Sequence, residues 1–180
     1  MISRVIGLVV QALRVACPLY AIWVFIRILW LIRRKHQLSW KREGVVQLLV
    51  FYLFCLAGIT IFRYGPDPSM AGRWNLIPVI HTIEILWADS AGAFLYNVVG
   101  NLIWFVPLGV LLPFLSSRFQ APWSALLAGG LVSACIEISQ LVLGTGVCDI
   151  DDLLFNALGA LLGWGVWKLF FKLKRRGTLL

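Results

Sequence analysis

Polar side chains that could bind a ligand or transfer a proton occur inside three of the most apolar stretches of this chain. Asn97 and Asn101 lie in one stretch, Glu137 and Gln140 in the next, and Asn156 in the last. A polar or ionisable group surrounded by hydrocarbon is costly unless it faces a partner, a cavity or a functional site. These five residues are therefore the first candidates for chemistry.

Their spacing places them on shared helix faces. Glu137 and Gln140 are three residues apart, Asp152 and Asn156 are four apart, and Asp149 precedes that second pair. Such spacings bring side chains together on one face of a helix. Carboxylate and amide oxygens can hold a hard divalent cation, and a desolvated carboxyl group can act as a general acid or base. The residues alone leave these uses open.

A phosphate group is a third ligand that suits this set. Amide N–H groups could bind it together with Arg63 or Arg73, because a guanidinium group matches phosphate geometry with two parallel hydrogen bonds. Both arginines follow the second apolar run of the chain. Of the two, we predict Arg73 as the ligand-binding residue.

The composition indicates a protein embedded in a membrane. Of 180 residues, 61% are hydrophobic and 13% are charged, and the mean hydropathy is +0.88. A soluble globular protein has roughly 45–50% apolar and about 25% charged residues, and a bilayer-spanning helix needs about 20 mostly apolar residues. We expect an all-α membrane helix bundle that forms a single domain over residues 1–180. Its five predicted spans are 5–32, 45–62, 93–115, 122–143 and 153–171.

The basic residues predict the orientation of these spans. The net charge is +8, yet eleven of the sixteen Lys and Arg residues fall at alternate ends of successive runs. This places them on one side of the membrane, and an excess of Lys and Arg in short loops marks the cytoplasmic side. We expect the N-terminus outside, the C-terminus in the cytoplasm, and no nucleic-acid partner. Arg14 further predicts a short interfacial helix before a first span that starts near Ala16.

This topology brings the polar faces of the last three spans to one depth. At about 1.5 Å per residue, Asn101 lies roughly 12 Å and Glu137 roughly 10 Å below the outer boundary. We therefore expect one cavity in the outer half of the bundle. Glycines in the same spans should allow close helix contact; they are Gly100, Gly109, Gly129, Gly130, Gly159 and Gly163.

The longest connection, residues 63–92, is predicted to cover the mouth of this cavity. Its first part is rich in glycine and proline, which favours irregular structure. After Pro78, apolar residues recur with helical periodicity, and Trp74 and Trp87 flank the segment. We expect an amphipathic helix in the plane of the membrane interface. His81 falls on its polar face, where a solvated side chain is the simpler interpretation than a zinc ligand.

Four short motifs follow one another between residues 73 and 165. They are Asn75-Leu76-Ile77-Pro78, then Asn97-x-x-Gly100-Asn101-x-x-x-Phe105-x-Pro107-Leu108-Gly109, then Glu137-x-x-Gln140, and finally Asp149-x-Asp151-Asp152-x-x-x-Asn156-x-x-Gly159-x-x-x-Gly163. In type, order and spacing these motifs resemble the VanZ-like family of bacterial membrane proteins. The first two spans carry no motif that matches.

The resemblance implies a multi-pass protein of the bacterial plasma membrane that acts on the cell envelope. The founding member of the family is associated with low-level resistance to teicoplanin, a glycopeptide that binds cell-wall precursors outside the membrane. By similarity, we expect this chain to bind or modify an anionic, lipid-linked cell-envelope molecule and to contribute to glycopeptide resistance. The expected partner is a membrane lipid or a lipid-linked cell-wall precursor. The predicted ligand-binding residues are Arg73, Asn75, Asn97, Asn101, Gln140, Asp149 and Asn156.

Two alternatives stay open beside this interpretation. The chain could be an intramembrane hydrolase or transferase, in which Glu137 and Asp152 would be the catalytic residues, with a carboxylate base or a carboxylate-bound divalent cation. It could also conduct ions or protons, because acidic cavities occur in transporters. The second alternative is weaker, since the cytoplasmic halves of the spans hold no comparable series of polar residues.

Overall fold

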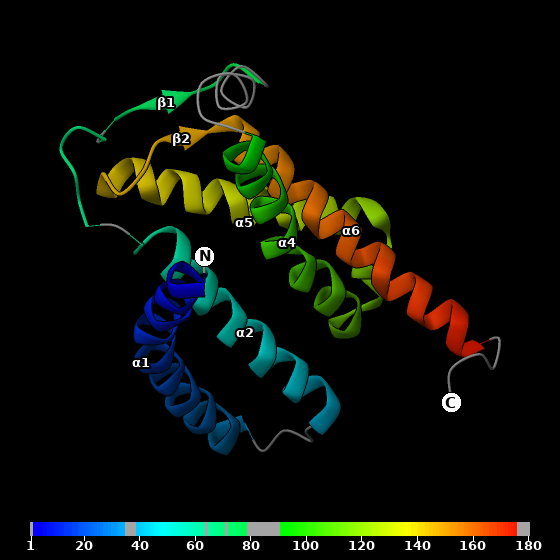
Figure 1. The fold of residues 1–180 in the computed structure, drawn as a ribbon. Helices are drawn as coiled ribbons and strands as arrows, with labels where there is room; N and C mark the ends of the chain where they lie inside the picture. The colour runs from blue at the N-terminus through cyan, green and yellow to red at the C-terminus, as the bar shows by residue number, and fades with distance from the viewer. Residues whose placement is uncertain (1, 35–38, 64, 71, 79–90, 176–180) are drawn as a thin grey trace.

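The computed structural model describes residues 2–34, 39–63, 65–70, 72–78 and 91–175, and this part of the chain is a bundle of long helices (Figure 1). The helices are α1 (Ile2–Arg34), α2 (Trp40–Thr60), α4 (Ala91–Leu115), α5 (Pro122–Leu143) and α6 (Ile150–Arg175), with a 3-10 turn, η1 (Ser117–Gln120). Among the described residues, five helices are long and apolar enough to cross a membrane. The all-α bundle predicted from composition is confirmed.

Local sequence explains where α5 begins and ends. Pro122 occupies the first turn, where its missing N–H would be unpaired in any case. Gly144 ends the helix in a left-handed conformation with φ of 64°, and its N–H donates to the Gln140 carbonyl. A left-handed residue after the last turn is the usual place for glycine.

Helix α1 differs from its prediction. It runs without a break from Ile2 through Pro18 to Arg34, so the expectation of a separate interfacial helix before a span near Ala16 is wrong. Proline is tolerated within spanning helices because neighbouring groups and small local adjustments satisfy the backbone carbonyl that it leaves free. Arg14 is exposed on this helix.

Helices α1 and α2 form a hairpin beside the other three spans (Figure 1). The two helices approach closely at Gly58, where a Cβ atom would lie 2.9 Å from Ala12 Cα. Near its other end, the Arg27 guanidinium donates to both carboxylate oxygens of Glu43, at 3.0 and 2.7 Å, and Gln47 also donates to Glu43 at 2.7 Å. This network pairs the charge of Arg27, which would be costly to hold unpaired in apolar surroundings.

Helices α4, α5 and α6 pack through glycine. A Cβ atom at Gly109 would overlap the backbone of Ala160, one at Gly159 would overlap Leu102, and one at Gly163 would overlap Val106. At Gly129, on α5, a Cβ would lie 2.7 Å from Ala160 Cβ on α6. The predicted role of these glycines in close helix contact is confirmed.

Two of the predicted contact glycines behave differently. At Gly100 a Cβ would meet nothing within 4 Å, so the expectation of close helix contact there is wrong. Gly100 instead lines a cavity, where its missing side chain leaves space. Gly130 has only an ordinary contact, with Ala157 Cβ at 4.0 Å.

Two loops at one end of the bundle are joined by a short parallel strand pair. Strand β1 (Trp74–Asn75) pairs with β2 (Cys148–Asp149), so that Asn75 lies opposite Asp149. The Cys148 N–H donates to the Arg73 carbonyl at 3.1 Å, and the Asp67 N–H donates to the Gly144 carbonyl at 2.8 Å. The irregular loop expected after α2 is therefore fixed to the loop before α6. The predicted interfacial helix and His81 lie outside the described residues.

Candidate functional site

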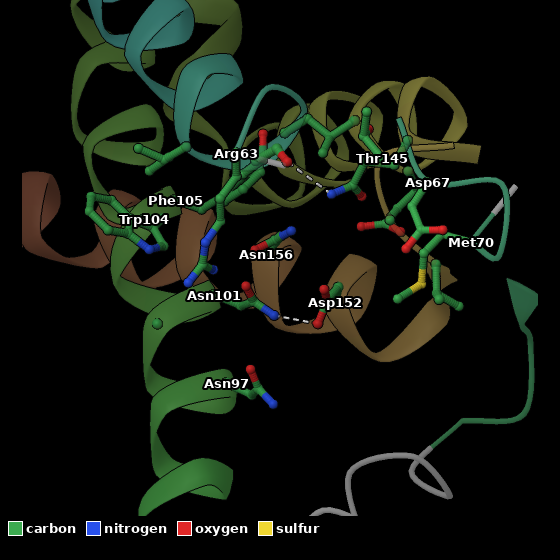
Figure 2. Close-up of a pocket in the computed structure, with 18 of the residues that line it drawn as sticks. Arg63, Asp67, Met70, Asn97, Asn101, Trp104, Phe105, Thr145, Asp152 and Asn156 are labelled. Carbon is green, nitrogen blue, oxygen red and sulfur yellow. Dashed lines mark hydrogen bonds between the residues drawn. The ribbon is translucent and has the colours of Figure 1, made fainter. Parts of the chain in front are cut away.

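The polar residues of three helices surround one cavity of about 620 Å³, at the same end of the bundle as the strand pair (Figure 2). Six of the nine predicted site residues line it, namely Asn97, Asn101, Glu137, Gln140, Asp152 and Asn156. Helix α4 contributes the first two, α5 the next two and α6 the last two. The i, i+3 and i, i+4 spacings turn each pair to the same side of its helix.

Hydrogen bonds between these side chains connect the helices around the cavity. The Asn101 amide donates to the Asp152 carboxylate, which joins α4 to α6 (Figure 2). The Asn156 amide donates to Ser133 Oγ at 2.8 Å and joins α6 to α5. The Gln140 amide donates to the Thr60 carbonyl at 3.2 Å and joins α5 to α2. The cavity wall is therefore fixed by polar contacts as well as by glycine packing.

Glu137 connects the cavity wall to the strand pair. Its side chain is 4% exposed, and its Oε2 atom accepts the backbone N–H of Asp149 at 2.8 Å. A hydrogen bond between a carboxylate and a backbone N–H is among the stronger kinds. Glu137 thus holds the loop before α6 in place while it lines the cavity.

Asp149 and Asn75 support the site without lining the cavity. The Asp149 Oδ1 atom accepts the N–H of Asp151 at 2.9 Å, as an N-cap of α6 does. The same oxygen accepts the Asn75 amide at 3.3 Å, across the strand pair. Asp151, which follows the cap, is buried at 3% exposure. Neither Asp149 nor Asn75 is among the cavity-lining residues, so the structure places both where they position α6.

The structure separates the two arginines that follow α2. Arg63 lines the cavity, and Figure 2 shows its side chain extending into it. Arg73 is exposed and does not line the cavity; its carbonyl belongs to the strand pair. The sequence signal for Arg63 is its position directly after the apolar run of α2, which keeps it close to the bundle.

Several further cavity residues were not among the predicted site residues. Trp104 and Phe105 of α4 line it, and so do Asp67 and Thr145 from the two loops. Hydrogen bonds from Ser69 lower the pKa of Asp67, so this carboxyl group is an anion at neutral pH. The path of the two loops brings Asp67 and Thr145 to the cavity. Helical periodicity does not predict that path.

Two polar atoms beside the cavity have no hydrogen-bond partner among the described residues. They are Thr145 Oγ1 and Asn156 Oδ1, on side chains that are 7% and 5% exposed. Leaving such a group unsatisfied costs about 1–3 kcal/mol. Buried orphan atoms in native proteins usually mark a strained or functional position or a bound water.

The described residues contain no group of three or more His, Cys, Asp or Glu side chains arranged to hold a metal ion. The carboxylates of Glu137 and Asp152 are instead engaged with Asp149 N–H and Asn101. The divalent-cation alternative therefore gains no support from this arrangement.

Cys148 provides a pH-dependent prediction at the edge of the site. Burial raises the pKa of its thiol, and the negative charges of Glu137 and Asp149 raise it further. Because the thiolate is the reactive form, alkylation of Cys148 should require a higher pH than alkylation of glutathione. The measurement is the rate of iodoacetamide labelling against pH in a variant with Ser at Cys17, Cys55 and Cys135. A labelling midpoint at or below that of glutathione contradicts the predicted environment.

The helices, the basic ends and the polar cavity define the class of the molecule: a multi-pass helical membrane protein with a polar site at one end of its bundle. A family model described as VanZ/LLP1 matches residues 49–171, which cover the second half of α2, all of α4 and α5, and most of α6. The chain belongs to the VanZ/LLP1 family, as its motifs predicted. Comparison with curated proteins gives no match, and comparison with solved structures gives none either.

Proposed function

We propose that this VanZ/LLP1-family protein binds the polar head of a lipid-linked cell-envelope molecule in the cavity between α2, α4, α5 and α6. The observation that carries the proposal is the convergence of six polar side chains, from three spanning helices, on one cavity of about 620 Å³. Ligand sites are typically concave, with volumes of about 300–1,000 Å³ and a few convergent polar groups. A binding site within a spanning bundle is open to a ligand that is itself anchored in the membrane.

The hydrogen bonds around the cavity favour a ligand that carries both phosphate and donor groups. Asn101, Gln140 and Asn156 each donate one amide N–H within the protein. The Oδ1 atom of Asn156 has no hydrogen-bond partner among the described residues, so it can accept a hydrogen bond from a ligand. Amide and carboxylate oxygens accept hydrogen bonds from hydroxyl or amide groups, such as those of a sugar or a peptide. The guanidinium of Arg63 suits the phosphate.

This division of roles refines the expectation of an anionic ligand. A ligand with negative charge throughout would be repelled by Asp152 and Asp67, which both line the cavity. A lipid-linked phosphosugar avoids this repulsion when its phosphate lies at Arg63 and its hydroxyl groups face the carboxylates. We place the mouth of the cavity on the outer side of the bacterial plasma membrane, because the basic ends of the helices mark the opposite side.

Retention of a cell-wall precursor at this site is a route to glycopeptide resistance. Teicoplanin acts outside the membrane on such precursors, and a protein that sequesters or modifies them changes the target. We propose this contribution from the family resemblance and the polar cavity together. The corresponding test is a teicoplanin-resistance assay on cells that lack the chain. These cells are complemented either with the wild-type protein or with the Arg63→Gln variant.

Membrane hydrolysis or group transfer is the second candidate, and one observation favours it. Glu137 is a buried carboxylate in the wall of the cavity, 4% exposed and beside Asp152 of α6. A carboxyl group in such surroundings can act as a general acid or base. Under this alternative, Glu137→Gln abolishes turnover of a lipid-linked substrate while the substrate still binds.

Native mass spectrometry of the purified protein tests the binding proposal. We expect wild-type protein to carry a lipid-linked molecule whose fragments include phosphate and sugar. Arg63→Gln and Asn97→Leu should each reduce its retention about tenfold, equivalent to about 1.4 kcal/mol. Ser139→Ala is the control, because Ser139 Oγ donates only to the Cys135 carbonyl of its own helix. Equal retention in all four proteins, or wild-type protein with bulk phospholipid alone, contradicts the proposal.

A further inference from the structure

A second concave surface lies at the opposite end of α6. It is a groove of about 600 Å³ between the junction of η1 with α5 and the last turns of α6. From Asn156 in the polar cavity to Lys172 in the groove, α6 advances 16 residues, or about 24 Å at about 1.5 Å per residue. The groove and the cavity are therefore separate sites on one helix. We call the groove the basic-end groove.

The basic-end groove combines three cations with an aromatic floor. Its cations are Lys168, Lys172 and Arg175, at positions i, i+4 and i+7 of α6. This spacing aligns them on one face of the helix. All three are exposed, and none of the residues that line the groove is acidic. The lining of the groove therefore carries a net positive charge.

The floor of the groove is made by Trp164, Trp167 and Phe171. The Trp164 indole N–H donates to the Gln120 carbonyl at 2.9 Å and fixes η1 against α6. Lys168 Nζ lies 4.7 Å from the centre of the Trp164 ring, over its face. The Trp167 indole N–H is buried without a hydrogen-bond partner among the described residues. Tryptophan at this position is typical of the membrane–water interface.

An adjoining hollow extends the apolar floor toward α4. Its volume is about 270 Å³, and it shares Trp167, Phe171 and Arg175 with the groove. Phe114 of α4 lines it and packs on Phe171, with the two ring centres 5.8 Å apart. The combined surface is long and apolar, with positive charge along one side. A molecule that fits it has a chain of hydrocarbon and an anionic end.

We propose that the basic-end groove binds an anionic phospholipid of the surrounding leaflet. Its phosphate would contact Lys172 and Arg175, and one acyl chain would lie along Trp167 and Phe171. Basic pockets between spanning helices recognise anionic lipid headgroups through this charge complementarity. Lysine side chains suit the position because their alkyl stems lie on the apolar surface while the ammonium group reaches the headgroup. This proposal does not depend on the ligand proposed for the polar cavity.

Lipid exchange measured by native mass spectrometry tests this site. The probes are mixed micelles with phosphatidylglycerol or with phosphatidylcholine, which share acyl chains and differ in headgroup charge. Lys172→Gln with Arg175→Gln is the groove variant. Lys174→Gln with Arg118→Gln is the matched control, because it removes the same charge from exposed positions that do not line the groove.

We expect wild-type and control proteins to retain phosphatidylglycerol over phosphatidylcholine equally well. The groove variant should lose this preference about tenfold, since each basic residue near the surface contributes substantially to anionic lipid binding. A Lys172→Arg, Arg175→Lys variant should keep the preference for phosphatidylglycerol, which shows that the fold tolerates change at these positions. Equal loss in groove and control variants means general charge attraction and overturns the site. No loss in the groove variant overturns it too.

Discussion

Gly163→Ala is expected to lower the free energy of unfolding strongly, because it adds a methyl group to α6 where α4 lies against it. The new Cβ would overlap the carbonyl oxygen of Val106 and approach Gly109 Cα at 3.1 Å. Both obstacles are backbone atoms, which cannot rotate away as a flexible side chain can. Overpacking of this kind typically costs about 1–3 kcal/mol, and occasionally more. Thermal unfolding of the purified protein in detergent measures the loss.

The matched control for this prediction is Gly165→Ala, two residues along the same helix. A Cβ at Gly165 would meet nothing within 4 Å. In a helix, alanine is favoured over glycine by roughly 0.5–1 kcal/mol, so this variant should be unchanged or slightly more stable. If the two variants unfold at the same temperature, α4 and α6 do not pack at Gly163 as described.

The same packing also determines the polar cavity. Asn101 of α4 donates to Asp152 of α6, close to Gly159, where a Cβ would overlap Leu102. Separation of the two helices would widen the cavity and break this hydrogen bond. Ligand retention should therefore fall in Gly163→Ala even at temperatures where the protein remains folded.

Glu137→Ala is the second change with a large expected effect. It removes the acceptor of the Asp149 N–H and leaves that buried donor unsatisfied, at a cost of about 1–3 kcal/mol. It also enlarges the cavity and frees the loop that begins α6. We expect a lower unfolding temperature and loss of the ligand from the polar cavity.

Glu137→Gln separates the hydrogen bond from the charge. Its amide oxygen can still accept the Asp149 N–H, so stability should stay closer to the wild-type value than in Glu137→Ala. Thermal unfolding and native mass spectrometry of both variants give the comparison. If Gln and Ala destabilise the protein equally, the charge of Glu137 rather than its hydrogen bond holds the loop. If neither destabilises it, Glu137 does not anchor β2.

Helical periodicity and hydropathy predicted the parts of the molecule that depend on local sequence. The five spans and the shared faces of Asn97 with Asn101 and of Glu137 with Gln140 follow from residue spacing alone. The contact role of Gly159 and Gly163 follows from their spacing as well. Each of these features repeats along one helix, where neighbours in sequence are neighbours in space.

Features that depend on the path of loops were not predictable in this way. The strand pair between Trp74–Asn75 and Cys148–Asp149 joins segments more than 70 residues apart, with two residues in each strand. That pairing makes Asp149 and Asn75 positioning residues and takes Arg73 away from the cavity, while Arg63 enters it. Gly100 lies at the cavity because no helix crosses there, which spacing within α4 does not reveal.

The basic residues of α6 illustrate a different limit. In the sequence, Lys168, Lys172 and Arg175 indicate only which end of the helix faces the cytoplasm. The groove above their aromatic neighbours forms only where η1 and the start of α5 lie beside α6. The same three residues therefore indicate the orientation of α6 when the sequence is read alone. In the structure they support the proposed lipid site.

Photocrosslinking from two adjacent residues of α4 tests most directly that the polar cavity holds a lipid-linked ligand. Trp104 lines the cavity, whereas its neighbour Ile103 is 59% exposed and does not line it. With benzoylphenylalanine at each position in native membranes, position 104 should capture a phosphate- and sugar-bearing lipid, and position 103 should capture bulk phospholipid. Identical crosslinked products at both positions would contradict a ligand site in this cavity.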